Sequence, residues 1–307
     1  EQHVFNGEFE ERVSYPAVLG HEFGGRVVRK GKSVTRFNQG DRVVVDPIIP
    51  CRTCIACHEG RFNACGSLKL RGIDLPGGMA EEVVCDEFQL FPYPEALPME
   101  QSPMVELYSI ACHAAVRGSL LPGDTVAVFG AGKVGLSVID VFAHSGACKV
   151  IAVDVVDERL GVAEKLGVAL TVNPLRDDPI EKIFDFTEGK GVDKAVEAVG
   201  HFETTGEIPP PVAAAGEVLR PGGRLVVLGQ GPQRTSLFFK PLVWKEIEIV
   251  MSRVSLGEFG RAVRLLEKGA LHPDEIITHV VPLEKAGEMF VKLEQDKERY
   301  IKVVLRV

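Results

Sequence analysis

Four of the seven cysteines in this chain of 307 residues lie close together, at Cys51, Cys54, Cys57 and Cys65. The first three can surround a tetrahedral ion within one tight loop, and the fourth can complete its coordination. Four thiolates at about 2.3 Å form a closed structural zinc site that leaves no position open for chemistry. The same ligands suit an iron–sulfur cluster, but no other feature of the chain indicates electron transfer. The spacing therefore favours a structural zinc ion.

A second candidate is a glycine-rich turn that follows an apolar run at 125–129 and precedes a helical pattern at 136–144. Its sequence is Gly130-Ala131-Gly132-Lys133-Val134-Gly135. The first glycine permits a tight turn, the second lets a pyrophosphate approach the backbone, and the third lets helix and strand pack closely. The helix offers free N–H groups and a positive dipole end to phosphates. The turn, including Lys133 and Val134, is therefore predicted to bind a dinucleotide.

Asp154 ends the next apolar run, 150–154, about 20 residues after the last glycine of the turn. A carboxylate at that position hydrogen-bonds the adenosine ribose hydroxyls, and it would repel the additional phosphate of NADP. The sequence therefore favours NAD. Arg159 keeps the alternative open, because it can lie over the adenine or bind a phosphate.

The elements that position these residues change in character near residue 102. Before it, short β-branched runs at 26–29, 42–45 and 82–84 alternate with glycine-rich turns. This pattern predicts short strands in an irregular, β-rich domain.

After residue 102, strand and helix patterns alternate, and the runs 194–200 and 224–229 again end in glycine. Such alternation predicts an α/β fold with a doubly wound parallel sheet. The last part of the chain adds predicted helices at 258–268 and 283–293 and a strand at 301–305.

Composition excludes several classes of function. The formal net charge of −8 argues against a nucleic-acid partner, which would require a basic face. No apolar run approaches the roughly 20 residues of a membrane helix, and no secretory signal opens the chain. We therefore expect a cytoplasmic protein, in which the isolated Cys85, Cys112 and Cys148 are packing residues.

The chain resembles the medium-chain zinc alcohol dehydrogenases over essentially its whole length. Gly20-His21-Glu22, the turn Gly40-Asp41-Arg42-Val43, the cysteine cluster and the segment 130–154 occur in that family in this order and spacing. The polyol branch, which comprises sorbitol-, threonine- and sugar-acid-dehydrogenase-like proteins, is the most similar, because Glu106 stands where other alcohol dehydrogenases carry a cysteine ligand.

The resemblance implies two domains. A GroES-like, zinc-containing catalytic domain would comprise 1–105 and 256–307, and a Rossmann domain that binds NAD would comprise 106–255. The family's remaining zinc ligand is a cysteine in a Cys-Gly-x-Asp-x-His-like motif. Gln2-His3 matches only the end of that motif, with Glu1 at its aspartate position, so the opening part of the catalytic domain is expected to be missing.

The same resemblance assigns catalytic roles. His21 would be a ligand of a catalytic zinc ion, Glu22 a ligand or near neighbour, and Glu106 a ligand or a partner of the bound water. His3 is a candidate proton-relay or substrate-contact residue, or alternatively a surface histidine near a chain end.

Further cofactor contacts also follow from the family. Gly200 and Gly229 end strands where the backbone would approach the ribose and nicotinamide, and Ser252 and Arg253 match a segment that reaches the cofactor phosphates in polyol relatives.

The expected activity is hydride transfer between NAD and a small secondary alcohol or its ketone. The substrate would be a polyol, a sugar acid or a 3-hydroxy amino acid, and the protein a homodimer or homotetramer. One alternative is a dinucleotide-binding relative without a catalytic zinc site. Another is an NADP-linked reductase of the cinnamyl-alcohol type, against which Asp154 and Glu106 both argue.

Overall fold

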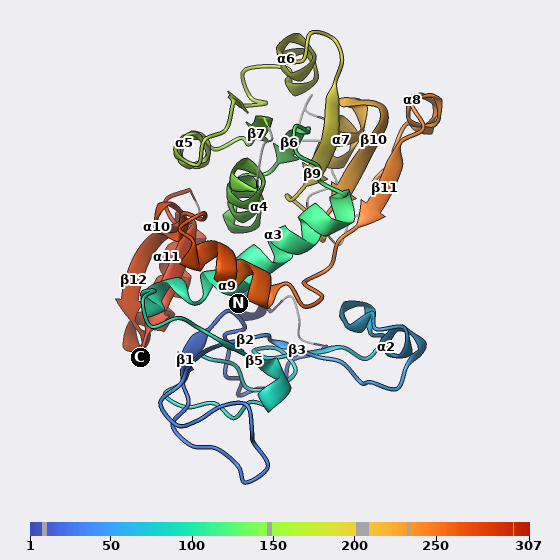
Figure 1. The fold of residues 1–307 in the computed structure, drawn as a ribbon. Helices are drawn as coiled ribbons and strands as arrows, with labels where there is room; N and C mark the ends of the chain where they lie inside the picture. Colours follow the sequence, from blue (N-terminus) through green and yellow to red (C-terminus); the bar gives the residue numbers. More distant parts are fainter. Residues whose placement is uncertain (8–10, 146–148, 201–208, 232–233, 297) are drawn as a thin grey trace. The chain divides into compact units, whose positions relative to one another are not determined.

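The computed structural model describes residues 1–307 except 8–10, 146–148, 201–208, 232–233 and 297. Cys148 therefore lies outside the described residues. The chain divides into two units (Figure 1). The first unit comprises Glu1–Ser109, Val254–Gly269 and Ile277–Val307, and the second comprises Ile110–Arg253 and Ala270–Ile276.

A six-stranded parallel sheet in the order β11-β10-β9-β6-β7-β8 organises the second unit, which confirms the predicted doubly wound fold. The strands are β6 (Thr125–Phe129), β7 (Lys149–Val153), β8 (Leu170–Val172), β9 (Val192–Glu197), β10 (Leu219–Val227) and β11 (Glu248–Met251). On β6, Ala127 and Phe129 face a cluster that includes Ile183 and Val212, while Val126 and its neighbours on the opposite face are also buried. Burial on both faces explains why the strand is a continuous apolar run.

Helices connect the strands of this sheet. They are α4 (Lys133–His144), α5 (Asp157–Lys165), α6 (Pro179–Phe186), α7 (Pro211–Glu217) and α8 (Phe239–Trp244), and the short α10 (Pro273–Ile276) packs against α4 and α5. Local chemistry fixes the start of α6, where the Asp178 carboxylate accepts hydrogen bonds from the backbone N–H groups of Ile180 and Glu181, and Pro179 occupies the first turn. The longer α3 (Met104–Gly118) begins in the first unit and ends in the second.

The first unit is irregular and rich in short strands. Its sheets are the antiparallel β1 (Gly24–Arg26), β2 (Arg42–Val45) and β5 (Leu90–Pro92), the antiparallel β3 (Ile48–Ile49) and β4 (Lys69–Leu70), and the parallel β12 (Ile277–Pro282) and β13 (Lys302–Arg306). Its helices are α1 (Gln2–Phe5), α2 (Ile55–His58), α9 (Phe259–Glu267) and α11 (Ala286–Gln295), with 3-10 turns η1 (Phe62–Ala64), η2 (Glu87–Gln89), η3 (Met99–Gln101) and η4 (Leu283–Lys285). The predicted strand at 42–45 is confirmed, whereas the one at 82–84 is wrong. Residues 82–84 form no strand, and Val84 is 90% exposed.

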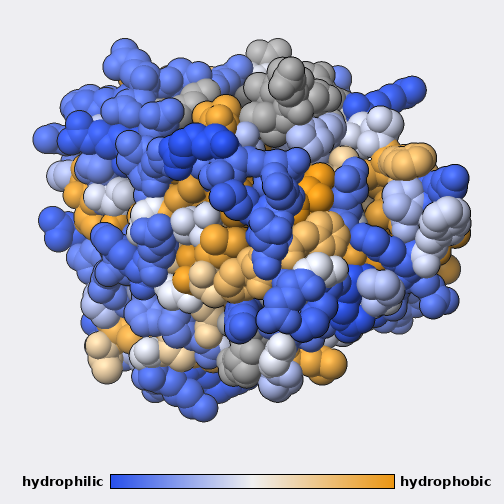
Figure 2. Space-filling view, turned by 90° about the horizontal axis from the view of Figure 1, so that it is seen from above, coloured by the Kyte–Doolittle hydropathy of each residue, from blue (hydrophilic) through white to orange (hydrophobic). Residues whose placement is uncertain are grey.

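The surface is mainly hydrophilic on the face seen in Figure 2, where apolar side chains lie among polar ones. Within the part of the chain that the structure describes, no helix combines the length and apolar character needed to cross a membrane.

Candidate functional site

The predicted dinucleotide residues lie along one edge of the parallel sheet. Gly130, Asp154 and Ser252 directly follow β6, β7 and β11, and Gly200 and Gly229 come shortly after β9 and β10. In open α/β sheets, ligands bind outside the carboxyl ends of the strands, where the strand order reverses. Here the order reverses between β6 and β9. The five positions therefore surround the place where a dinucleotide would bind.

The glycine-rich turn has the backbone geometry that its sequence predicts. Gly130 has φ +99°, which favours glycine, and a Cβ on Gly135 would overlap the carbonyl oxygen of Gly130. The helix α4 begins directly afterwards, and Gly132 at its N-cap supplies no side-chain hydrogen bond. The space over Gly132 is open, since a Cβ built there would meet no atom within 4 Å. The backbone N–H groups of Lys133 and Val134 thus start a helix that suits a phosphate.

Asp154 links the end of β7 to this turn. Its Oδ2 accepts a hydrogen bond from the backbone N–H of Ala131 at 2.6 Å, and its Oδ1 accepts one from Val156 at 2.9 Å. The guanidinium of Arg159 lies 4.0 Å from the same carboxylate. The carboxylate is therefore held in place beside the turn, with a cation next to it.

Glu197, which the sequence analysis did not identify, joins two strand ends at the same edge. It is fully buried at the end of β9. Its carboxylate accepts hydrogen bonds from the N–H groups of Val199 and Gly200, and its carbonyl oxygen accepts them from Leu228 and Gly229. A carboxylate directly after the buried apolar pair Ala195-Val196, at the end of the strand, is the sequence signal that could have revealed it.

Ser252 and Arg253 follow β11 at the side of the sheet. The Ser252 backbone N–H donates to the Val227 carbonyl oxygen at 2.9 Å, and the residue is 5% exposed. Its hydroxyl has no hydrogen-bond partner among the described residues. A buried hydroxyl without a partner at this edge is consistent with a contact to a bound cofactor.

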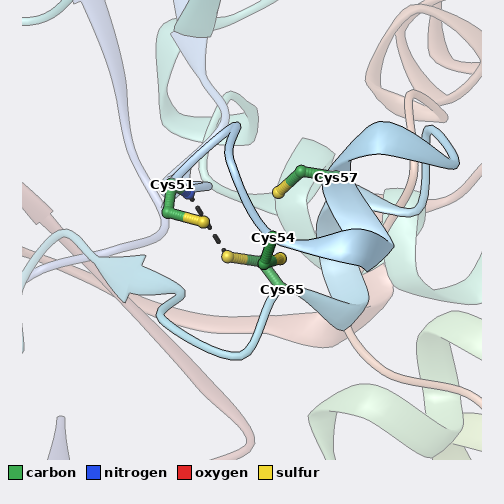
Figure 3. A group of neighbouring side chains, drawn as sticks. All are labelled: Cys51, Cys54, Cys57 and Cys65. Carbon is green, nitrogen blue, oxygen red and sulfur yellow. Dashed lines mark hydrogen bonds between the residues drawn. The ribbon is translucent and has the colours of Figure 1, made fainter.

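The four clustered cysteines come together as their spacing predicts (Figure 3). Their sulfur atoms all lie within 4.8 Å of one another. Cys54 precedes α2, Cys57 lies in that helix, and Cys65 follows the turn η1. The backbone N–H of Cys51 donates to the Cys65 sulfur at 3.3 Å. Four convergent sulfurs from one short segment fit a tetrahedral zinc ion.

The protonation of these thiols depends on their surroundings. A hydrogen bond from the Thr53 hydroxyl is the main reason why the pKa of Cys51 falls to about 6. Burial, in contrast, raises the pKa of Cys57 to about 12. Both would be thiolates around a bound metal, because a coordinated thiol loses its proton.

A second group gathers around His21 in the first unit. The carboxylate of Glu1 lies 2.7 Å from Nδ1 of His21 and also accepts a hydrogen bond from its backbone N–H at 2.9 Å. On the other side of the ring, Oε1 of Glu22 lies 3.6 Å from Nε2. These three residues have ligand atoms within 4.8 Å of one another.

Charges around His21 outweigh its burial. Desolvation alone would lower the pKa of His21, but the negative charges of Glu1, Glu22 and Glu106 raise it above its ordinary value. Glu106 contributes from the first turn of α3, where it is 5% exposed. The structure therefore brings Glu22 to His21 and lets the charge of Glu106 act on the ring, while the group whose ligand atoms lie within 4.8 Å of one another comprises Glu1, His21 and Glu22.

Two members of this group were not assigned a site role from the sequence. Glu1 holds His21 from the Nδ1 side, and Lys302 of β13 forms an ion pair with Oε2 of Glu22. The second contact joins residues 280 positions apart in the chain, so no spacing rule points to it. The other predicted member, His3, lies in α1, and its side chain is outside the described residues.

Comparison with known families gives two matches. Residues 1–95 match the alcohol dehydrogenase GroES-like domain, and residues 134–268 match the zinc-binding dehydrogenase domain. Sorbitol dehydrogenase of Bacillus subtilis is 30% identical to this chain over 95% of the chain and 82% of its own length.

Solved structures agree with this match over nearly the whole chain. The RspB alcohol dehydrogenase of Escherichia coli CFT073, complexed with NADH, has a TM-score of 0.90 at 28% identity and covers 99% of this chain and 87% of its own. A zinc-binding dehydrogenase of Sinorhizobium meliloti 1021, bound to NADP, has a TM-score of 0.89 at 28% identity, with coverage of 100% and 87%.

Proposed function

Because the chain belongs to the zinc-type medium-chain alcohol dehydrogenases, in their polyol branch, we propose that it transfers a hydride between NAD and a small secondary alcohol or its ketone. The proposed substrate is a polyol, a sugar acid or a 3-hydroxy amino acid. Residues 1–105 and 256–307 would form the catalytic domain, and 106–255 the domain that binds NAD.

The observation that carries the proposal is the arrangement around His21. Its Nδ1 is occupied by Glu1, so its Nε2 is the nitrogen that faces Glu22 and remains suited to a metal. A carboxylate on the far nitrogen of a histidine ligand fixes its tautomer and increases its basicity. Zinc held by His21, with Glu22 and Glu106 as further ligands or neighbours, would supply a Lewis acid that favours loss of the substrate's hydroxyl proton.

The cofactor preference rests on Asp154. Its carboxylate would accept hydrogen bonds from the ribose hydroxyls and would oppose a 2′-phosphate, which favours NAD although one relative binds NADP. We propose one structural and one catalytic zinc ion per chain, with the structural ion held by the four-cysteine cluster.

Activity and metal content together test this function. Protein expressed from the natural start of its reading frame is assayed with NAD and NADP against polyols, sugar acids and 3-hydroxy amino acids, and its zinc is measured per chain. Two zinc ions and faster turnover with NAD are expected. Asp154→Ser should reduce the preference for NAD over NADP, because the repulsive carboxylate is lost.

A dinucleotide-binding protein without turnover is the second candidate. It is favoured by one observation: among the described residues, no cysteine joins the group around His21. NADH binding, one zinc ion per chain and no activity on the whole panel would establish this candidate and exclude the enzyme.

We further propose a homodimer or homotetramer. Among the residues that the structure describes, the edge strand β11 pairs with β10 alone, and the neighbouring side chains of Phe238, Phe239 and Trp244 are at least 60% exposed. Light scattering of the protein and of Trp244→Glu tests whether this edge holds the subunits together.

A further inference from the structure

Three potential metal ligands meet in the second unit and share no residue with the groups described above. Asp140 and His144 lie one turn apart on α4, on the same face of the helix. His272 directly precedes α10. The Asp140 side chain is fully buried, whereas those of His144 and His272 are 32% and 42% exposed.

Both imidazoles converge on one carboxylate oxygen. Nδ1 of His144 lies 3.1 Å from Oδ1 of Asp140, and Nδ1 of His272 lies 3.0 Å from the same atom. The other oxygen, Oδ2, accepts a hydrogen bond from the backbone N–H of His272 at 2.7 Å. The two rings are 4.4 Å apart between centroids. Nδ1 of His144 also lies 2.9 Å from the backbone carbonyl oxygen of Asp140, so Asp140 positions both histidines through its carboxylate and its carbonyl group.

These separations fit a metal ion. Ligand atoms bonded to zinc at 2.0–2.2 Å lie about 2.9–3.5 Å from one another in tetrahedral or octahedral geometry. The three groups offer ligand atoms within 4.8 Å of each other, so small rotations of the partly exposed rings would complete the arrangement. Two imidazoles and a carboxylate suit zinc and similar transition-metal dications.

The position is distinct from the proposed cofactor site. His144 is the last residue of α4, about 16 Å along the helix from its start at the glycine-rich turn. The described acidic and histidine residues around His21 belong to the first unit. An ion at Asp140 would therefore use none of the residues proposed for hydride transfer and none of the cysteine cluster.

We propose that Asp140, His144 and His272 form a third metal site, which binds Zn²⁺ and leaves at least one coordination position to water. The ion fastens the segment Ala270–Ile276 to α4. This segment belongs to the second unit although the chain on both sides of it belongs to the first. The site therefore stabilises the position of Ala270–Ile276 within the second unit.

The proposal is tested by measuring zinc binding to protein in which the proposed structural and catalytic zinc sites are already filled. The zinc-loaded, desalted protein is titrated with Zn²⁺ by calorimetry, and the ions per chain are counted by native mass spectrometry. One additional ion is expected. His144→Ala, His272→Ala and Asp140→Asn should each weaken its affinity about tenfold or more, because each removes one of three ligands.

Glu275→Gln is the matched control. It removes the ion pair between Glu275 and Lys165, which also attaches this segment, but it removes no ligand. Its affinity for the additional ion should match that of the unaltered protein. Thermal unfolding without added zinc shows whether each variant is folded. The proposal is overturned if no additional ion binds, if the ligand variants bind it unchanged, or if Glu275→Gln weakens it equally.

Discussion

The cysteine cluster and the group around His21 lie in the same unit and both suit a metal, but they are built in opposite ways. All four sulfurs of the cluster come from residues 51–65, a single short segment. The His21 group instead takes Glu1, Glu106 and Lys302 from distant parts of the chain. The cysteine cluster is formed by one local loop, whereas the His21 group forms only when distant parts of the chain fold together.

The difference also concerns charge and access. Four thiolates fill every position of a tetrahedral ion, whereas one imidazole with nearby carboxylates leaves room for an exchangeable ligand. A closed site can stabilise a fold, and an open one can take part in chemistry. The two groups should therefore respond to substitution in different observables, the first in stability and the second in turnover.

The largest expected effect follows the loss of His21. His21→Ala should lower kcat/KM for the alcohol by about a thousandfold or more, because it removes the imidazole around which the proposed catalytic metal is bound. The thermal midpoint should change little, and one zinc ion per chain should remain. Steady-state kinetics and metal analysis check both points. Activity within tenfold of the unaltered protein would remove His21 from the proposed mechanism.

Substitution in the cysteine cluster should have the converse result. Cys57→Ser is expected to lower the thermal midpoint by about 10 °C, since a structural metal ion contributes directly to folding. The folded fraction should keep its KM for the alcohol. His58 lies in the same segment and its side chain is exposed, so His58→Ala serves as the control. Its thermal midpoint should equal that of the unaltered protein. Equal midpoints in Cys57→Ser and His58→Ala would mean that the cluster holds no structural ion.

The same contrast explains what the sequence could predict. The cysteine spacing and the strand–turn–helix at 125–144 are local patterns, so the sulfur group and the glycine-rich turn were found from the residues alone. The prediction of a strand at 42–45 was also correct. These features depend on short-range geometry, which spacing describes.

Features set by the folded unit were not predicted. Residues 82–84 have the β-branched composition of a strand, but no neighbouring strand pairs with them, and Val84 is exposed. The helix α3, which carries Glu106, was not predicted either. The pairing of Lys302 with Glu22 joins residues 280 positions apart. Such contacts depend on tertiary packing, which overrides local propensity.

Glu1 should have an intermediate effect. Glu1→Gln removes the carboxylate that holds Nδ1 of His21, and loss of such a partner costs about 10–100-fold in metal affinity or activity. The pKa of His21 in the metal-free protein should fall, because the nearest negative charge is lost. An NMR titration of the His21 ring protons measures this shift.

The sign of the accompanying stability change follows from the raised pKa. The folded metal-free protein holds the His21 proton more tightly than the unfolded chain, so this contribution to stability is present below about pH 6.5 and is lost as the pH rises through the folded pKa. Glu1→Gln should reduce it. An identical pH dependence of unfolding in both proteins would show that Glu1 does not act through His21.

The smallest effect is expected from an exchange that keeps the charge beside Glu22. Lys302 is 7% exposed and pairs with Oε2 of Glu22, which leaves Oε1 toward His21. Lys302→Arg preserves the positive charge, but its planar fork can take both carboxylate oxygens and turn Oε1 away from the ring. We expect kcat/KM to fall about threefold to tenfold with an unchanged midpoint, whereas Lys302→Met should also destabilise the protein, since it leaves Glu22 buried without this partner. Steady-state kinetics and thermal unfolding of both variants distinguish the effect of where the Glu22 carboxylate points from the effect of the positive charge at residue 302. If Lys302→Arg and Lys302→Met lose activity equally, the charge of Lys302 does not matter to the His21 group, and its ion pair serves β13 alone.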